Sequence, residues 1–118
     1  RRESAKLLLQ KVTEIAGISP VIVTGDFNAT PEDEPIRILL DPASPQRLIN
    51  TLNISAMDHY GPTGTFNGFQ SHELSDQPID HIMIKNKVGV LKHATLSESW
   101  MGHFSSDHFP VLARIKIL

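Results

Sequence analysis

The sequence predicts a layered domain of the α/β or α+β class. Three observations support this prediction: an amphipathic helical pattern opens the chain, a β-branched apolar run bounded by proline and glycine follows it, and alternating apolar and polar residues end it. A helix, a strand, a second helix and then further strands is an order typical of helices that cover a sheet. The 118 residues suffice for one domain or part of one, and they contain no internal repeat.

The first half of the chain predicts two helices and one strand. A helix is expected over residues 2–16, where apolar side chains recur at helical spacing, namely Ala5, Leu8, Leu9, Val12 and Ile15. Gly17 ends this helix, because glycine adopts a positive φ without steric cost. The apolar run within residues 20–25 predicts a buried strand. A shorter helix is expected over residues 35–40, with Pro35 at its first position.

The second half predicts three further strands, over residues 79–85, 88–96 and 109–117. The last of them shows the clearest alternation, with Val111, Ala113 and Ile115 on one side of the strand. Residues 46–64 give only weak signals, apart from a turn over residues 61–64. No linker composition marks a second domain, so we expect one layered unit.

Composition excludes several classes of protein. Eleven Lys and Arg against 13 Asp and Glu give a net charge of −2, which excludes nucleic-acid binding driven by net charge alone. The absence of cysteine excludes a disulfide framework, a thiolate zinc site and a cysteine nucleophile, and it leaves the cellular compartment open. No apolar run approaches the roughly 20 residues of a membrane span. Because the chain opens on Arg1 without a methionine or a signal peptide, we expect it to begin within a longer protein.

The first polar segment with chemical potential is Gly25-Asp26-Phe27-Asn28, directly after the buried strand. Binding sites collect at such strand ends in layered α/β proteins. The Asp26 carboxylate suits a hard cation or a water proton, and the Asn28 amide suits a phosphoryl oxygen. The alternative is an Asx turn, in which both side chains serve only the local backbone.

The second segment, Pro78-Ile79-Asp80-His81, opens a predicted strand. A carboxylate near apolar neighbours is costly unless it is paired, and a histidine N–H is its simplest partner. The alternative places Asp80 on an edge strand facing water, with His81 as a partly buried neutral side chain.

The third segment covers residues 105–110, from Ser105 to Pro110, before the last strand. Asp107 offers an oxygen ligand for Mg²⁺ or Mn²⁺, and His108 offers a proton donor to phosphate. A serine-protease triad is excluded, because neighbours on an extended chain point apart. A zinc site built from His103, Asp107 and His108 is an alternative that lacks a further ligand nearby.

Taken together, the three segments at strand boundaries resemble the endonuclease/exonuclease/phosphatase superfamily. The residues that carry the resemblance are Gly-Asp-Phe-Asn at 25–28, Ile-Asp-His at 79–81 and Ser-Asp-His-Phe-Pro-Val at 106–111, with Gly-Thr-Phe-Asn-Gly-Phe at 64–69 between them. The resemblance covers nearly the whole chain. It implies one half of a DNase-I-like four-layer β-sandwich, with residues 1–118 as the C-terminal half and the N-terminal half absent.

The resemblance also implies a metal-dependent hydrolysis of phosphate esters with Mg²⁺ or Mn²⁺. By position, Asp26 matches the aspartate that orients the attacking water and contacts the metal, and Asn28 matches an amide that contacts the scissile phosphate. Asp107 matches a metal-site carboxylate. His108 matches the histidine that stabilises the phosphate, and Asp80 matches its hydrogen-bond partner. Phe66 lies where the family often places a substrate-facing aromatic ring.

The missing half leads to further expectations. This chain alone should be inactive or nearly so, because no acidic residue here takes the place of the metal-binding glutamate that the resemblance implies for the N-terminal half. One sheet face should be exposed and apolar, which favours association with the missing half or homodimer formation. The substrate class stays open among nucleic acids, phospholipids and sugar or inositol phosphates. The location stays open as well, with secretion or a bacterial periplasm among the options.

Two other functions remain alternatives to a phosphoesterase. One is a non-catalytic binding or scaffold module that keeps the fold. The other is a general metal-binding protein that uses the histidine-containing loops, for which His103 would be essential. The loop at Trp100 either faces the substrate or packs on the body of the domain.

Overall fold

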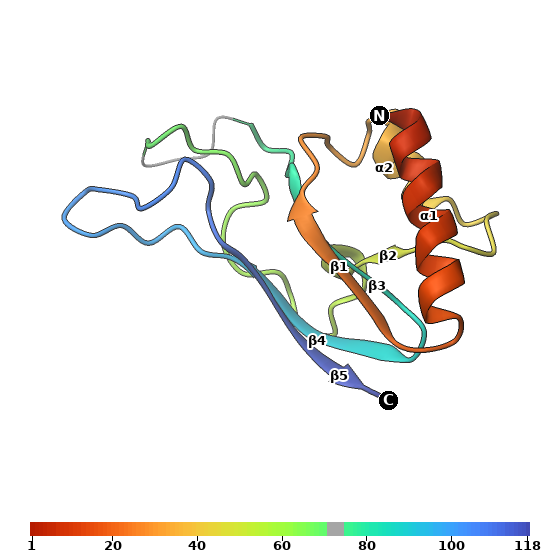
Figure 1. Ribbon diagram of the computed structural model, residues 1–118. Coiled ribbons are helices and arrows are strands. Elements are labelled where there is room, and N and C mark those ends of the chain that lie inside the picture. The colour runs from red at the N-terminus through yellow and green to blue at the C-terminus, as the bar shows by residue number, and fades with distance from the viewer. Residues whose placement is uncertain (71–74) are drawn as a thin grey trace.

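The computed structural model describes residues 1–70 and 75–118. Along the chain the elements are α1 (Arg2–Ala16), β1 (Val21–Asp26), α2 (Glu34–Leu40), β2 (Ile49–Asn50), α3 (Thr51–Ile54), β3 (Asp80–Lys85), β4 (Val88–Thr95) and β5 (Val111–Ile117). Helices α1 and α2 lie together at one end of the molecule, and long loops extend from the opposite end (Figure 1). Within these residues no helix has the length and apolar character needed to cross a bilayer.

The strands form two antiparallel sheets. A three-stranded sheet has the order β1-β3-β2, and β4 and β5 form a separate two-stranded ribbon. In the first sheet, Val21 lies opposite Lys85 and Asp26 lies opposite Asp80. This register brings two aspartates together at the end of the sheet from which the long loops leave (Figure 1).

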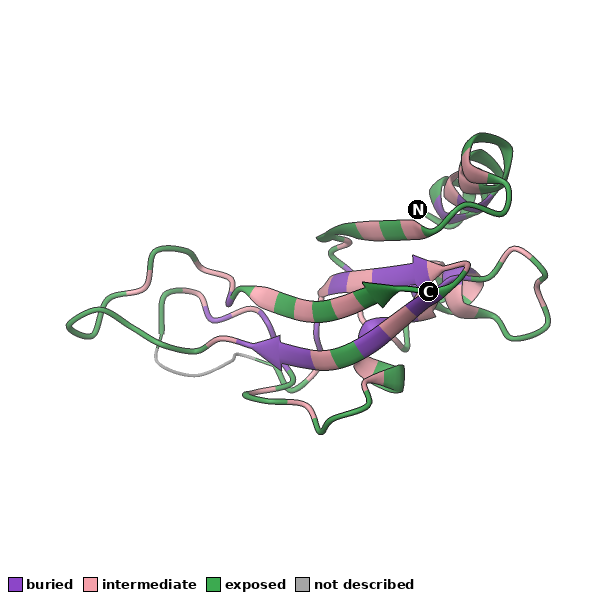
Figure 2. Ribbon diagram, turned by 90° about the horizontal axis from the view of Figure 1, so that it is seen from below, coloured by how far each residue is buried: buried purple, intermediate pink, exposed green. Residues whose placement is uncertain are grey.

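The core lies on both sides of β3, because successive side chains of a strand point to opposite faces. Met83 packs into a cluster with α1 and α2, whose buried members include Leu9 and Leu39. The next residue, Ile84, packs with Val88 and other apolar side chains of the β4–β5 ribbon. Burying an aliphatic side chain of this size contributes about 1.5–3 kcal/mol. Figure 2 shows β3 as one of the most buried elements, whereas β5 alternates between half-buried and exposed residues.

The mixed α/β layering predicted from the sequence is confirmed, with small shifts at the element ends. The helix expected over 35–40 begins one residue earlier at Glu34, so Pro35 follows its first position. The strand expected over 109–117 begins at Val111, because residues 109 and 110 belong to a loop that pairs with the segment around Thr65. The strands expected over 20–25, 79–85 and 88–96 each match within one residue at either end.

β2 and α3 lie in the stretch that gave only weak sequence signals. Asn50 joins them, since its side-chain oxygen accepts a hydrogen bond from the Leu52 N–H at 3.1 Å and caps the short helix. The Asn50 amide nitrogen lies 3.4 Å from Nδ1 of His81, whose Nε2 donates to the Ala29 carbonyl at 2.8 Å. Burial lowers the pKa of His81, so this ring is a neutral connector between β2, β3 and the loop after β1.

The histidines His59 and His93 contact each other and hold the segment before residue 62 against β4. His59 Nε2 donates to the Pro62 carbonyl at 2.9 Å, so its Nδ1 is left as an acceptor when the ring is neutral. The Nδ1 atom of His93 lies 2.9 Å from that acceptor and therefore carries the proton. Burial, together with the nearby rings of His59 and His81, lowers the pKa of His93 to about 4.

Next to His59 and His93, the close contact between residue 61 and β4 requires glycine. Tyr60 exchanges backbone hydrogen bonds with β4, to the His93 carbonyl at 3.1 Å and from the Thr95 N–H at 2.9 Å. Gly61 has a φ of +87°, and a Cβ built there would lie 2.0 Å from the Thr95 carbonyl oxygen. Any side chain at this position would push the segment away from β4.

We expect the stability of the chain to fall as the pH drops from about 6.5 toward 4. The pKa of His93 is about 4 in the folded chain against 6.5 for a free histidine, so the unfolded chain takes up the proton first. Integrated over that window, the loss amounts to about 3 kcal/mol. Urea unfolding followed by circular dichroism at several pH values measures it.

His93→Asn provides the control, because asparagine keeps a donor near the Nδ1 position but does not titrate in this range. This variant should be less stable at pH 7 yet show a flatter pH dependence below pH 6.5. A slope equal to that of the parent chain would contradict the assignment to His93.

Candidate active site

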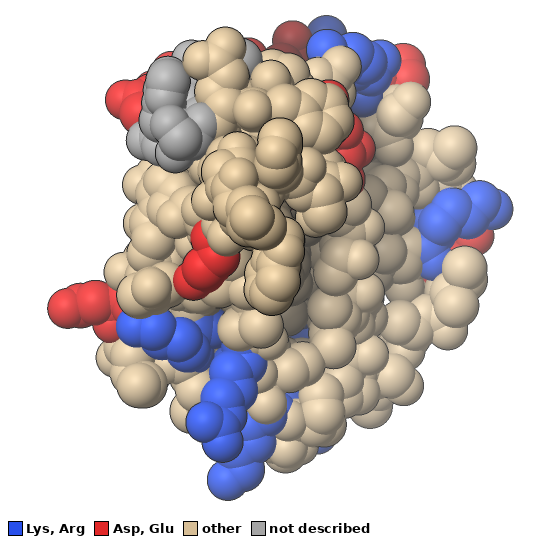
Figure 3. All heavy atoms as spheres, turned by 90° about the vertical axis from the view of Figure 1, so that its left-hand side faces the viewer, with Lys and Arg blue, Asp and Glu red and all other residues tan. Residues whose placement is uncertain are grey.

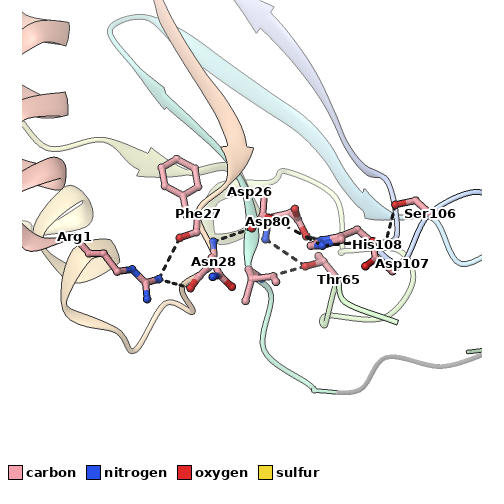
Figure 4. A network of polar contacts seen from close by, with 10 residues as sticks. Arg1, Asp26, Phe27, Asn28, Thr65, Asp80, Ser106, Asp107 and His108 are labelled. Atoms are coloured by element: carbon pink, nitrogen blue, oxygen red, sulfur yellow. Dashed lines mark hydrogen bonds and ion pairs between the residues drawn. The ribbon is translucent and has the colours of Figure 1, made fainter. Parts of the chain in front are cut away.

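The turn after β1 positions Asp26 at one side of the site. One carboxylate oxygen, Oδ1, accepts the Asn28 N–H at 2.8 Å, and Asn28 adopts a left-handed φ of +48°. The Asx turn considered from the sequence is therefore present, and it uses only one of the two oxygens. The other oxygen, Oδ2, faces His108 (Figure 4). The Asn28 side chain is exposed beside this carboxylate.

Asp80 is held at the start of β3 by the fully buried Thr65. The Thr65 hydroxyl oxygen accepts the N–H groups of Ile79 at 3.0 Å and of Asp80 at 3.3 Å. β3 is the central strand of its sheet, so the alternative of Asp80 on an edge strand facing water is wrong. The Asp80 side chain is 18% exposed, and its Oδ2 lies 2.8 Å from Nδ1 of His108.

His108 lies in the loop that leads into β5, and the segment around Thr65 holds its backbone. The Phe109 N–H donates to the Thr65 carbonyl at 2.6 Å, and the Asn67 N–H donates to the Asp107 carbonyl at 2.8 Å. Phe66 meets the imidazole edge to face, with ring centroids 5.3 Å apart. Phe66, expected to face the substrate, is half-buried and packs against the His108 ring.

Three carboxylates surround the His108 imidazole. With Nδ1 bonded to Asp80, Nε2 faces Asp26 Oδ2 and Asp107 Oδ1, each at 3.8 Å and too far for a hydrogen bond. The hydrogen bond to Asp80 raises the pKa of His108, the three negative charges add to this effect, and partial burial opposes it. The imidazolium form is thus favoured, with one N–H held by Asp80 and the other available to a ligand.

The site is open on the side of the sheet. Asp26 and Asp80 line a cavity of about 420 Å³ that runs between β1, β3 and the start of β5. A second cavity, of about 210 Å³, lies against His108 itself.

The donor atoms fit a hard divalent cation in part. Among the residues that the structure describes, one group of three potential ligands converges: one atom each from Asp26, Asp80 and His108, all within 4.8 Å of one another. Asp107, predicted as a metal ligand, lies outside this group although its carboxylate approaches His108. Because Mg²⁺ and Mn²⁺ prefer carboxylate oxygens, the Asp26 oxygen that faces His108 is a suitable donor, whereas Asp107 approaches the same imidazole without joining the group.

The zinc alternative is not supported. His103, Asp107 and His108 do not form a convergent group in the described part of the chain. His103 instead closes a tight turn with Trp100 through paired backbone hydrogen bonds of 2.8 and 2.9 Å. Trp100, at this turn, is 81% exposed, so the alternative in which it packs on the body of the domain is wrong.

Sequence reasoning missed two groups that hold the site. Thr65 supports Asp80 from 15 residues away, and Arg1 donates through its guanidinium to the carbonyls of Phe27 and Asn28. No local pattern marks either residue, because each acts on backbone that is distant in sequence. The Asn50–His81 link to Ala29 went unrecognised for the same reason.

Comparison with known proteins places this geometry in a family. The model of the endonuclease/exonuclease/phosphatase family matches residues 4–108. No curated protein matches the chain significantly.

Solved structures of similar fold agree with the family match. An endonuclease/exonuclease/phosphatase protein from Bacteroides vulgatus is 28% identical, with a TM-score of 0.86 over 99% of this chain and 44% of its own. A mannosyl-6-phosphatase from Bacteroides thetaiotaomicron is 26% identical, with a TM-score of 0.83 over 97% of this chain and 45% of its own. A conserved protein of unknown function from Enterococcus faecalis is 26% identical, with a TM-score of 0.80 over 100% of this chain and 46% of its own.

The chain thus spans somewhat less than half the length of these three structures. The predicted DNase-I-like architecture is confirmed over that part. On the family match and these structural likenesses, the chain belongs to the endonuclease/exonuclease/phosphatase family.

Proposed function

We propose that this chain is the C-terminal half of a phosphoesterase domain that hydrolyses phosphate esters with the help of Mg²⁺ or Mn²⁺. The observation that carries the proposal is the contact of 2.8 Å between Asp80 and His108, with the other imidazole nitrogen turned toward Asp26 and Asp107. Family membership and a structural neighbour named as a mannosyl-6-phosphatase support the same reaction class.

In this proposal His108 stabilises the phosphate. The imidazolium donates from Nε2 to a phosphoryl oxygen, where negative charge increases in the transition state. Asp80 accepts the Nδ1 proton at 2.8 Å, which orients the ring and favours its charged form. Phe66 limits rotation of the ring by contact with its edge.

Asp26 and Asn28 act on the same phosphate from beside His108, whose Nε2 lies 3.8 Å from Asp26 Oδ2. The free oxygen of Asp26 accepts a proton from the attacking water. This contact orients a lone pair of the water oxygen toward phosphorus. Because the other oxygen is tied to the Asn28 N–H, the carboxylate cannot rotate freely. The Asn28 side-chain amide is free to donate to a second phosphoryl oxygen.

Asp26 and Asp107 would hold the divalent cation. When bound, such an ion screens the charge of the phosphate and lowers the pKa of a nearby water. The two side chains are each about half exposed, so they can bind the ion without a large rearrangement of the core.

We further propose that a complementary half covers the face of the sheets that is open here. Ile22 and Ile117 are 48% and 54% exposed, although they lie within strands on the side where Ile84 meets Ile115. The match to less than half of each related structure supports this proposal. Without that half the chain would lack further site residues, so we expect it to be nearly inactive alone and prone to form homodimers.

The first test measures phosphate release by the full-length protein from p-nitrophenyl phosphate, bis-p-nitrophenyl phosphate and mannose 6-phosphate. Asp26→Asn and His108→Gln should each lower kcat about 10²–10³-fold, the usual effect of removing one group that stabilises transition-state charge. A chelator should abolish turnover, and added Mg²⁺ or Mn²⁺ should restore it.

Asp58→Asn is the matched control, since it makes the same chemical change at an exposed residue outside the site. It should leave kcat within about twofold. Turnover that survives both Asp26→Asn and His108→Gln at the parental rate would refute the proposal and favour the scaffold alternative.

A second prediction concerns Thr65, whose hydroxyl accepts two backbone N–H groups at the start of β3. Thr65→Val keeps the shape but leaves these donors without a partner, which should cost about 1–3 kcal/mol in the free energy of unfolding. Thr65→Ser should restore most of it. Urea unfolding of both variants measures the difference, and equal stability of Val and Ser would speak against this role.

A third prediction concerns the open face of the isolated chain. At micromolar concentration, size-exclusion chromatography with light scattering should report a mass above the monomer, because Ile22 and Ile117 expose apolar surface. Ile22→Lys should shift the mass toward the monomer. A monomer with sharp, well-dispersed amide resonances would count against association.

A further inference from the structure

The charged residues of this chain are distributed unevenly around the candidate active site. Three stretches, residues 12–36, 48–84 and 93–113, supply Asp26, Asn28, Asp80, Asp107 and His108. None of the 11 Lys and Arg residues lies in these stretches, which contain eleven of the 13 Asp and Glu residues. The acidic members are Glu14, Asp26, Glu32, Asp33, Glu34, Asp58, Glu73, Asp76, Asp80, Glu98 and Asp107.

The surface shows the same separation. On the face toward which the long loops extend, the central area is uncharged or acidic, and Lys and Arg atoms lie toward its edges (Figure 3). Arg1 lies next to the site, and its guanidinium donates hydrogen bonds to the carbonyls of Phe27 and Asn28. Arg1 lies on the opposite side of the cluster from Ser106 and His108 (Figure 4).

A cavity beside His108 lies on this uncharged side. It has a volume of about 210 Å³, and its polar lining, apart from His108, consists of Glu98, Ser105 and Ser106. Its apolar lining includes the half-buried ring of Phe104, which meets the buried ring of Phe109 edge to face with centroids 5.7 Å apart. The Ser106 hydroxyl oxygen accepts the backbone N–H of His108 at 3.1 Å and keeps its own O–H to donate, and Glu98 and Ser105 offer further polar groups to a ligand.

This lining suits a leaving group that carries hydroxyls and no negative charge. Aromatic rings pack against the C–H faces of a polyol, while a carboxylate and a hydroxyl accept and donate hydrogen bonds to its O–H groups. A second phosphate on the same substrate would meet Glu98 with no Lys or Arg from these stretches to compensate. Nucleic-acid backbones need several such cations, because each contacted phosphate is normally neutralised by Lys or Arg.

We infer that the substrate is a phosphate ester with a single phosphate on an uncharged, hydroxyl-rich leaving group, and that Glu98 is a specificity-determining residue that disfavours polyanions. This inference rests on the proposed phosphoesterase function and narrows its substrate class. It excludes nucleic acids and inositol polyphosphates from the substrate classes left open by the sequence.

The experiment compares kcat/KM of the full-length protein, with Mg²⁺, for mannose 6-phosphate, glucose 1,6-bisphosphate and a thymidine tetranucleotide. We expect mannose 6-phosphate to be preferred at least tenfold over either polyanion. Glu98→Lys should then raise the ratio of bisphosphate to monophosphate kcat/KM roughly five- to tenfold, because it reverses a charge within the same cavity.

Glu14→Lys is the matched control, since it makes the same reversal on α1 at a residue paired with Lys11. It should leave the ratio unchanged within about twofold. Preference for the bisphosphate or the tetranucleotide, or equal effects of the two reversals, would overturn the inference while leaving the phosphoesterase proposal intact.

Failure of every compound to be hydrolysed would instead overturn the phosphoesterase proposal. Isothermal titration calorimetry with the same three compounds then decides the inference by itself. Tighter binding of mannose 6-phosphate would support it, and binding of the bisphosphate as tight or tighter would refute it.

Discussion

The antiparallel register of β1 and β3 is the constraint on which the site depends. It sets Asp26 directly opposite Asp80, and like charges in facing positions destabilise a sheet. The imidazole of His108 relieves this repulsion from a third segment, with one nitrogen 2.8 Å from Asp80 and the other 3.8 Å from Asp26. The fold therefore brings together two acids that repel each other and one base that relieves this repulsion.

Because the site depends on this register, the contacts that fix the position of β3 matter for it. Met83 and Ile84 anchor it in separate apolar clusters on opposite faces, so a shift by one residue would exchange the two faces. At its start, Thr65 satisfies two backbone N–H groups, and the chain around Thr65 also pairs with Phe109. One short segment thus positions both Asp80 and the loop that carries His108.

Three histidines illustrate how the environment decides the chemistry of one residue type. His81 and His93 are buried, each has a lowered pKa, and each uses its ring nitrogens to join segments. His108 is also partly enclosed, yet the carboxylate beside it raises its pKa. A neutral ring suits a structural connector, whereas a ring that stays cationic suits an anion.

The sequence by itself determined the elements and the chemical groups of the site. Apolar periodicity predicted α1 and β5, and the three polar segments at strand boundaries, through their joint resemblance to a family, marked Asp26, Asn28, Asp80, Asp107 and His108 as candidates. The tertiary structure decided what those patterns cannot contain. The pairing of Asp26 with Asp80, the support of β3 by Thr65 and the two neutral histidine links all join residues far apart in sequence, and only the packed chain brings their atoms within hydrogen-bond distance. Trp100 and Phe66 show the limit most plainly: an aromatic side chain packs inward or stays exposed according to the neighbours that the fold provides, and no spacing along the chain encodes which.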